Sequence, residues 1–176
     1  QSVAANLFKL GYKIDTSITS YVNWSEYHGP DFSRVSAKPF RFTQDDIYKE
    51  NADGQMLEIP ATIAYLQRNQ ERCNAIARLL NKRPAKYLRL TGILDRLNLL
   101  NKVWLSPEMS DSSRMIQLAK GLLKENYTLI NMFFHSTTLM AGLNEFVRTR
   151  SDEKKFLRRI REFLTFTRDS GIEPIL

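Results

Sequence analysis

The sequence is poor in the residues that build covalent and metal-bound frameworks. It has one cysteine, Cys73, and two histidines, His28 and His135, among 176 residues. A single cysteine excludes a disulfide within the chain and a zinc site made of cysteines. Two histidines far apart in the sequence do not form a metal-binding motif by themselves. The lone thiol is consistent with a reducing compartment, and we expect no metal site in this chain alone.

Glycine-rich loops and long apolar runs are also missing. The seven glycines are dispersed, which argues against a phosphate-binding loop and against nucleotide or dinucleotide cofactors. The best apolar run, residues 129–134, is interrupted by Asn131 and falls far short of the ~20 apolar residues of a membrane helix. The chain starts at Gln1 without a signal-peptide core. We therefore expect a cytoplasmic protein with no membrane span.

Positive charge exceeds negative charge, with 26 Lys and Arg against 19 Asp and Glu and a formal net charge of +7. Such a balance is compatible with a nucleic acid, an anionic membrane surface or an acidic glycan as partner. The basic residues are spread along the chain, with concentrations at 82–83, 86–89, 154–155 and 158–161. No zinc-finger or RNA-recognition signature accompanies them. A solvated surface is the simpler interpretation, and we expect no nucleic-acid partner.

Hydrophobic residues make up 43% of the chain, which is typical of a globular domain. Apolar periodicity and turn residues predict alternating helices and strands. The expected helices cover residues 2–10, 70–80, 87–99 and 111–124, with a last helix capped by Ser151. The expected strands cover 12–18, 56–61, 102–105 and 128–134, with a strand start at 172–176 and a long loop over 21–54.

This alternation favours an α/β architecture with a mostly parallel sheet, as in part of a (β/α) barrel. The pattern begins within a helix and ends at the start of a strand. We therefore expect one domain over 1–176 that lacks elements at its N-terminus and at its C-terminus.

In such folds the side chains just past the carboxyl ends of strands face the ligand. That rule selects Asp15 with the following loop, residues 58–62, residues 106–108 and residues 135–138. His135 is the sharpest candidate, because histidine is best suited to proton transfer near neutral pH. The alternative is a histidine that hydrogen-bonds its own loop and has no catalytic role. His28, in the long loop, is a weaker candidate.

The other candidates each have a structural alternative. Asp15 could pair with His135, or it could stabilise a turn. Trp24 and Tyr21 could form a wall on which a sugar stacks, or they could pack the long loop onto the core. Glu58 could face the ligand or lie on a sheet edge. Ser136 could contact substrate, but no nucleophile-elbow pattern surrounds it, so a serine hydrolase is poorly supported.

Seven short segments resemble, in order, the motifs of polysaccharide deacetylases, in the branch found near glycosyltransferase genes. Residues 10–19 (LGYKIDTSIT) are similar to the strand pattern G-Y-x-x-D-S-S-V-T-P. Trp24 and residues 29–32 (GPDF) follow it, and residues 39–41 (PFR), 56–62 (MLEIPAT), 104–107 (WLSP), 133–139 (FFHSTTL) and 146–149 (FVRT) continue the series. The matches cover most of the chain, and their order carries more weight than any one of them.

The resemblance implies a distorted (β/α) barrel and a metal-dependent hydrolase that removes N-acetyl groups from a glycan. It implies a divalent metal, usually zinc, held by one Asp and two His, with a second Asp as base. It matches His135 to the family's general acid and Asp15, less securely, to the family's fourth-motif region; the pairing of Asp15 with His135 is a hypothesis.

The metal ligands and the base of that family have no counterpart between Gln1 and Leu176. We expect them before Gln1, so the resemblance implies the C-terminal part of a larger enzyme and an isolated chain without activity. A non-catalytic glycan-binding or interaction protein with a deacetylase-like fold is the alternative, and a basic nucleic-acid-binding domain is a third class.

Overall fold

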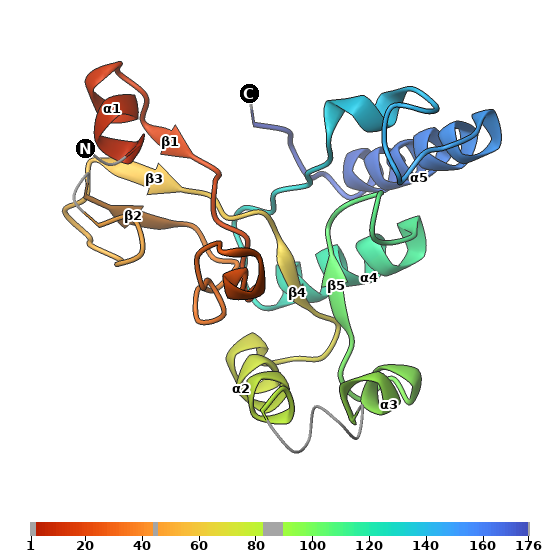
Figure 1. Ribbon diagram of the computed structural model, residues 1–176, viewed down its shortest axis with the longest axis horizontal. Helices are drawn as coiled ribbons and strands as arrows, with labels where there is room; N and C mark the ends of the chain where they lie inside the picture. The colour runs from red at the N-terminus through yellow and green to blue at the C-terminus, as the bar shows by residue number, and fades with distance from the viewer. Residues whose placement is uncertain (1–2, 44–45, 83–89, 176) are drawn as a thin grey trace.

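Two small β-sheets, flanked by helices, organise the chain in the computed structural model (Figure 1), which describes residues 3–43, 46–82 and 90–175. The fold is mixed α/β, and the described strands do not close into a barrel. None of the described helices is long and apolar enough to cross a bilayer.

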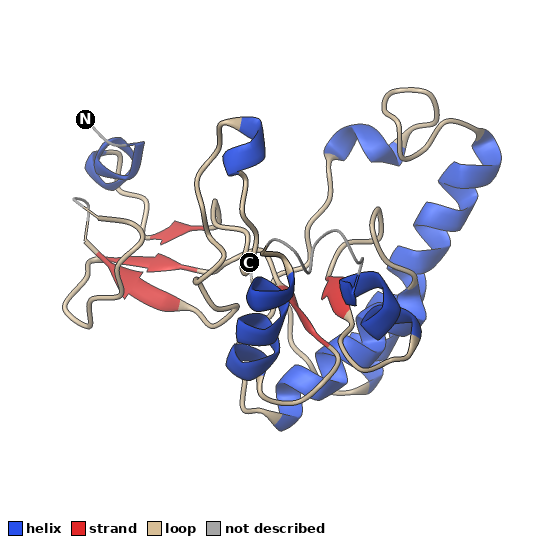
Figure 2. Ribbon diagram, turned by 60° about the horizontal axis from the view of Figure 1, so that its bottom comes forward, coloured by secondary structure: helices blue, strands red, loops and turns tan. Residues whose placement is uncertain are grey.

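The first sheet has three strands in the order β1 (Ile14–Asp15), β3 (Met56–Glu58) and β2 (Phe40–Phe42). β1 runs parallel to β3, and β2 runs antiparallel to it. A small core of Ala4, Phe42 and Met56 packs this sheet against α1 (Val3–Lys9). Figure 2 shows this sheet and α1 set apart from the longer helices.

The second sheet pairs β4 (Ile63–Tyr65) with β5 (Lys102–Trp104) in antiparallel register. The larger core lies between this sheet and two helices that contact it, α2 (Gln70–Leu80) and α4 (Ser112–Lys124). The helix α3 (Leu90–Arg96) packs against α2, and α5 (Arg150–Asp169) packs against α4. Buried side chains at helical spacing on α4 form its centre, namely Met115, Leu118, Ala119 and Leu122.

The long helices begin where side chains cap their free backbone N–H groups. Asp111 accepts a hydrogen bond from the Arg114 N–H at 2.8 Å at the start of α4. α5 is capped two residues earlier than the Ser151 cap that the sequence predicts, because Thr149 and Asp152 form a reciprocal capping box. The α4 and α5 starts are therefore fixed by local hydrogen bonds as well as by their apolar faces.

The α/β expectation is confirmed at the level of fold class, but the mostly parallel sheet is not found. Both β2–β3 and β4–β5 are antiparallel, and β1–β3 is the parallel ladder among the described strands. The sequence does not predict β2 and β4, and residues 128–135 and 172–175 form no named strand. Residues 87–89 of the predicted 87–99 helix lie outside the described residues.

Three segments distant in sequence meet at Thr62, and this meeting positions the candidate site. The Thr62 carbonyl accepts from the Leu105 N–H at 2.8 Å, and its N–H donates to the Asn131 carbonyl at 3.1 Å. The Phe133 N–H in turn donates to the Leu105 carbonyl at 3.2 Å. The turn after β5 and the end of the 128–135 segment are thereby brought side by side.

Candidate functional site

The site lies where the turn that follows β5 meets η2 (Ser136–Leu139), a single turn of 3-10 helix. Glu108 comes from the turn, which Ser106 stabilises by accepting the Glu108 and Ser110 N–H groups on its hydroxyl and carbonyl oxygens. His135 is the residue directly before η2. α5 supports the turn from outside, because Arg159 donates to the Pro107 carbonyl at 2.9 Å.

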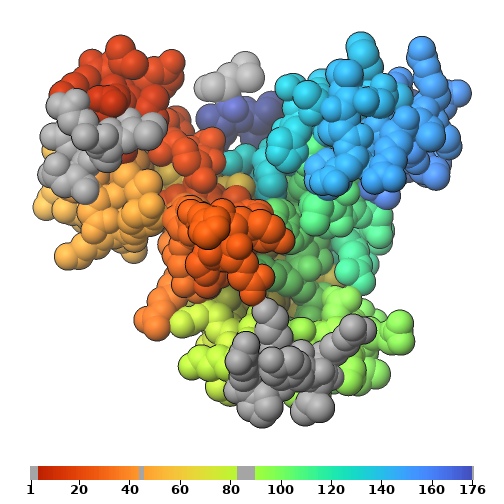
Figure 3. Space-filling view, viewed as in Figure 1, coloured from red at the N-terminus to blue at the C-terminus, as the bar shows by residue number. Residues whose placement is uncertain are grey.

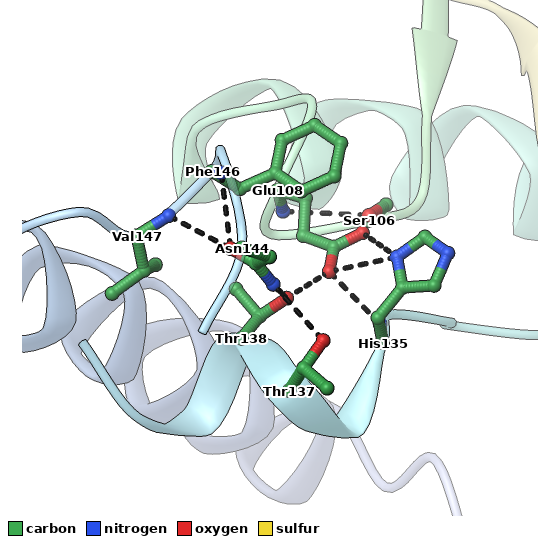
Figure 4. Close-up of polar contacts among 8 residues, drawn as sticks. All are labelled: Ser106, Glu108, His135, Thr137, Thr138, Asn144, Phe146 and Val147. Carbon is green, nitrogen blue, oxygen red and sulfur yellow. Dashed lines mark hydrogen bonds and ion pairs between the residues drawn. The ribbon is translucent and has the colours of Figure 1, made fainter. Parts of the chain in front are cut away.

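His135 and Glu108 form a close pair, which Figure 4 shows. The ring Nδ1 lies 3.0 Å from Glu108 Oε2 and 3.1 Å from Oε1. The backbone N–H of His135 also donates to Oε1, at 2.8 Å. One carboxylate therefore holds both the main chain and the side chain of the histidine.

The carboxylate of Glu108 is enclosed, whereas the histidine is open. The Glu108 side chain is 2% exposed and the His135 side chain 70% exposed. Burial without partners would be costly for a carboxylate, so its contacts with His135 and with the Thr138 hydroxyl are required. Glu108 is fixed, and it presents the imidazole toward solvent.

A second layer of polar side chains holds this pair in place. Thr138 is buried and donates its hydroxyl to Glu108 Oε1. Asn144 Nδ2 donates to Thr138 Oγ1 at 2.6 Å, while Asn144 Oδ1 accepts the Phe146 and Val147 N–H groups at 3.0 Å. The loop after η2 is thereby tied to the carboxylate through Thr138.

The Phe146 ring lies parallel to the imidazole, with centroids 6.0 Å apart and an angle of 8° between planes. A stacked ring restricts rotation of His135 about its side-chain bonds. A small cavity of about 60 Å³ adjoins Glu108 and Phe146 and reaches Lys155 on α5. It is large enough for water next to the carboxylate, but not for a sugar.

The geometry defines which ring nitrogen can react. An ionised carboxylate only accepts hydrogen bonds, so the Nδ1 of His135 carries a hydrogen that points to Glu108. Nε2 then accepts a proton in the neutral ring and donates one in the charged ring. Figure 4 shows this nitrogen on the side of the ring directed away from Glu108. The arrangement is suited to general acid–base chemistry at Nε2.

Asp15, expected as the partner of His135, has other contacts. Its Oδ1 accepts the Thr16 N–H at 2.8 Å and the Ser17 hydroxyl at 2.6 Å. These local hydrogen bonds make Asp15 a turn-forming residue at the end of β1. The structure brings Glu108, not Asp15, against the histidine ring.

Of the two residues predicted to stack on a sugar, Tyr21 lies in the core. It is 4% exposed, its ring packs against Tyr65, and burial raises the pKa of its hydroxyl. A buried ring has no face to offer a ligand. Trp24 is half-buried, and its ring contacts Trp104.

Glu58 is 0% exposed and lies within β3, in register with Asp15 on β1. Its Oε1 accepts the Ile18 N–H at 3.1 Å. Burial, and to a lesser extent the nearby charge of Asp15, raises its pKa to about 8, so the carboxyl is protonated at neutral pH. A substrate cannot contact Glu58 in this position. Ser136 is exposed at the start of η2, next to His135.

The described residues do not fit the zinc site that the resemblance implies. Within residues 3–43, 46–82 and 90–175, no group of three His, Cys, Asp or Glu side chains could hold a metal ion. His135 and Glu108 form a pair without a third such ligand. We therefore derive no chemical step through a metal.

Comparison of the chain with protein-family models, with curated proteins and with solved structures gives no significant match. The role of the site is therefore argued from its geometry. Sequence reasoning identified His135 and selected the 106–108 turn, but it did not single out Glu108 as the partner. Thr138 fell within the selected residues 135–138 but was given no role, and Asn144 carried no signal, because its function depends on a contact made only in the folded chain.

Proposed function

We propose that this chain carries the acid–base histidine of a hydrolase that removes N-acetyl groups from a glycan. The His135–Glu108 pair is the observation that supports this most, since the carboxylate holds Nδ1 and leaves Nε2 toward solvent. The ordered motifs that resemble carbohydrate deacetylases supply the reaction class. The same motifs suggest that the mixed α/β elements belong to a distorted (β/α) barrel.

His135 acts as the general acid at the leaving nitrogen. An amide C–N bond breaks readily only when the departing nitrogen receives a proton, because an amine leaves far more easily than its anion. After water has added to the acetyl carbon, Nε2 of the charged ring donates its proton to that nitrogen. The C–N bond breaks, acetate and the free amine leave, and the ring becomes neutral while its Nδ1 keeps the hydrogen that it donates to Glu108.

Glu108 is a positioning residue in this proposal. It fixes the tautomer of His135 and stabilises the charged ring, as a buried carboxylate does for a catalytic histidine in other hydrolases. Its hydrogen bonds to the His135 backbone N–H and to Nδ1 hold the ring in one orientation. The step assigned to this chain is proton delivery, whereas the resemblance attributes activation of the water to residues that the described chain does not contain.

Acetate release from an N-acetylated oligosaccharide by the complete gene product tests the proposal. His135→Gln should lower kcat by about 10²–10⁴-fold, the usual contribution of a general acid or base. His28→Asn is the matched control, because Asn tolerates the left-handed backbone at that position (φ 59°) and lies outside the pair. Equal turnover of His135→Gln and the unaltered protein would remove His135 from the mechanism.

A non-catalytic glycan-binding protein with a deacetylase-like fold is the second candidate. The half-buried ring of Trp24 favours it, because such rings bind sugars whether or not chemistry follows. Oligosaccharide binding by the complete protein without any acetate release would support this candidate over the hydrolase.

A further inference from the structure

One side of α5 carries basic side chains over almost its whole length. At about 100° per residue, five of them fall within a sector of about 80°, namely Arg150, Lys154, Arg158, Arg161 and Arg168. All five are exposed. At a rise of about 1.5 Å per residue, the first and the last lie about 27 Å apart along the helix axis. We call these five residues the basic stripe.

The basic stripe lies opposite the side on which α5 packs. Phe156 and Phe163, on the packed side, are buried. Through that side α5 contacts α4 and η2, and Arg159 reaches the Pro107 carbonyl. Within the part of the chain that the structure describes, no element covers the stripe, since all of its side chains are exposed.

The charge of the stripe is only partly balanced. Arg158 lies 3.9 Å from Glu162, and Arg168 lies 2.9 Å from Asp169. Arg150, Lys154 and Arg161 form no ion pair with another described residue. The positions 150, 154 and 158 are also successive i, i+4 neighbours, and like charges at that spacing destabilise a helix. An anionic partner along the stripe would offset this repulsion.

Exposed apolar side chains border the stripe along one edge. Leu157 and Leu164 lie within about 40° of it around the helix. They are 41% and 51% exposed. The outer side of α5 therefore combines a cationic sector with an apolar one, although a helix that faces only water gains nothing from exposed leucines.

The loop after η2 extends this apolar border. Met140 and Leu143 are both exposed. The Ala141 N–H between them donates to the Glu153 carboxylate at 3.0 Å, which fixes the loop one helical turn before Leu157. Figure 3 shows the loop and α5, in neighbouring shades of blue, side by side at one corner of the molecule. We call Met140, Leu143, Leu157 and Leu164 the apolar border.

The surface of an anionic bilayer matches both features. Lys and Arg side chains bind negative headgroups, while leucine and methionine side chains beside them enter the outer part of the acyl region. A nucleic acid fits less well, because the stripe and its border carry no aromatic ring on which a base could stack. A second copy related by a two-fold axis would place stripe against stripe, with like charges opposed.

We propose that the basic stripe and the apolar border form a docking surface for a membrane with anionic headgroups. In this arrangement α5 lies along the headgroups and does not cross the bilayer. The proposal goes beyond the proposed function and does not depend on it, because vesicles of pure phospholipid contain no N-acetylated glycan.

Sedimentation of the complete gene product with vesicles tests the docking surface. One set of vesicles is phosphatidylcholine alone, and the other is equal parts of phosphatidylcholine and phosphatidylserine. Binding should be confined to the second set and should weaken with added salt. Arg150→Gln, Lys154→Gln and Arg161→Gln together should weaken binding about 100-fold, since each basic residue near an anionic surface contributes about fivefold.

The matched control removes three positive charges from exposed positions outside α5, by Arg34→Gln, Lys49→Gln and Arg72→Gln together. This control should bind the anionic vesicles nearly as well as the unaltered protein does. Circular dichroism shows whether each variant is folded. If both folded triple variants lose affinity equally, net charge alone drives the binding and the docking surface is overturned. Equal binding to phosphatidylcholine alone would overturn it as well.

Replacing the leucines distinguishes a lipid surface from other partners. Leu157→Gln and Leu164→Gln together should weaken binding to the anionic vesicles about tenfold, because each side chain loses the burial of its exposed part. Unchanged vesicle binding by this variant would remove the apolar border from the proposal. Tighter binding to a DNA duplex than to the vesicles would contradict a membrane partner. A dimer that this variant dissociates, without vesicle binding, would contradict it too.

Discussion

Replacing Glu108 by glutamine removes the negative charge of the side chain while keeping its size and shape. In the unaltered chain, Oε1 accepts the His135 N–H and the Thr138 hydroxyl, and Oε2 faces Nδ1 at 3.0 Å. The amide side chain of Glu108→Gln can keep the first oxygen and its two donors. It places an NH2 group where Oε2 was, so a donor now faces Nδ1. The NH2 group favours a hydrogen on Nε2, in competition with the remaining Oε1, which lies 3.1 Å from Nδ1, and the charged ring loses its anionic partner.

The size of the effect follows from that one contact. A hydrogen bond to a charged group is worth about 1.5–3 kcal/mol, which corresponds to about 10- to 150-fold in rate. We expect kcat for acetate release to fall within that range, while the affinity for oligosaccharide stays the same. Stability should change little, because the two donors to Oε1 remain paired. Glu108→Ala, in contrast, should destabilise the fold, since it leaves the buried Thr138 hydroxyl without its acceptor.

The assay combines acetate-release kinetics with the ¹⁵N chemical shifts of the His135 ring. Those shifts distinguish a hydrogen on Nδ1 from one on Nε2. Glu145→Gln is the control, because Glu145 is exposed on the neighbouring loop and its side chain lies outside the pair. Retention of the Nδ1 hydrogen in Glu108→Gln together with unchanged kcat would refute the reasoning.

Three further predictions concern the fold. The folded pKa of Glu58, about 8, is above its ordinary value of 4.5, so the stability that its protonated carboxyl contributes is complete below about pH 4.5 and is lost as the pH rises through 8. The free energy of unfolding should fall by at most about 5 kcal/mol over this range. Glu58→Gln should flatten that fall, as urea unfolding at several pH values will show. Thr149→Ala should lower the free energy of unfolding by about 1 kcal/mol through loss of the α5 capping box, and a Tm equal to that of the unaltered protein would contradict this. Gly121→Ala should raise stability by about 0.5–1 kcal/mol, because a Cβ in this α4 position meets nothing within 4 Å; destabilisation in the same unfolding assay would count against the packing described.

The helices were predictable because each carries an apolar face at helical spacing. Cys73 and Ala77 on α2 are buried four residues apart, and the buried face of α4 repeats in the same way. The strands were less predictable because most are two or three residues long, too short for an alternating pattern to be recognised. Their pairing depends on partners elsewhere in the chain, such as β5 for β4.

The candidate site was predictable in part. His135 follows an apolar run and precedes hydroxyl residues, which is typical of a loop at the end of a strand. The choice of Asp15 over Glu108 as its partner could not be made from spacing, because contacts across the fold decide it. The Thr16 and Ser17 that follow Asp15 are a signal that was available, since such residues favour a local turn around an aspartate.

Tyr21 shows a second limit of sequence reasoning. An aromatic residue in a long polar loop is compatible with a ligand wall or with an anchor. The structure turns Tyr21 inward at a positive φ of 59°, where its ring meets Tyr65. Trp24, three residues later, keeps part of its ring at the surface. The backbone conformation of the folded loop decides which aromatic residue anchors the loop to the core and which remains at the surface.

The most direct test of the central claim compares two substrates in the complete gene product carrying His135→Ala. Hydrolysis of an N-acetylated oligosaccharide requires protonation of the leaving nitrogen. Hydrolysis of the acetyl ester of a nitrophenol releases nitrophenolate, a stable anion that needs no acid. If His135 is the general acid, kcat should fall about 10²–10⁴-fold for the amide and stay nearly unchanged for the ester. An equal loss for both substrates, or no loss for the amide, would contradict the account.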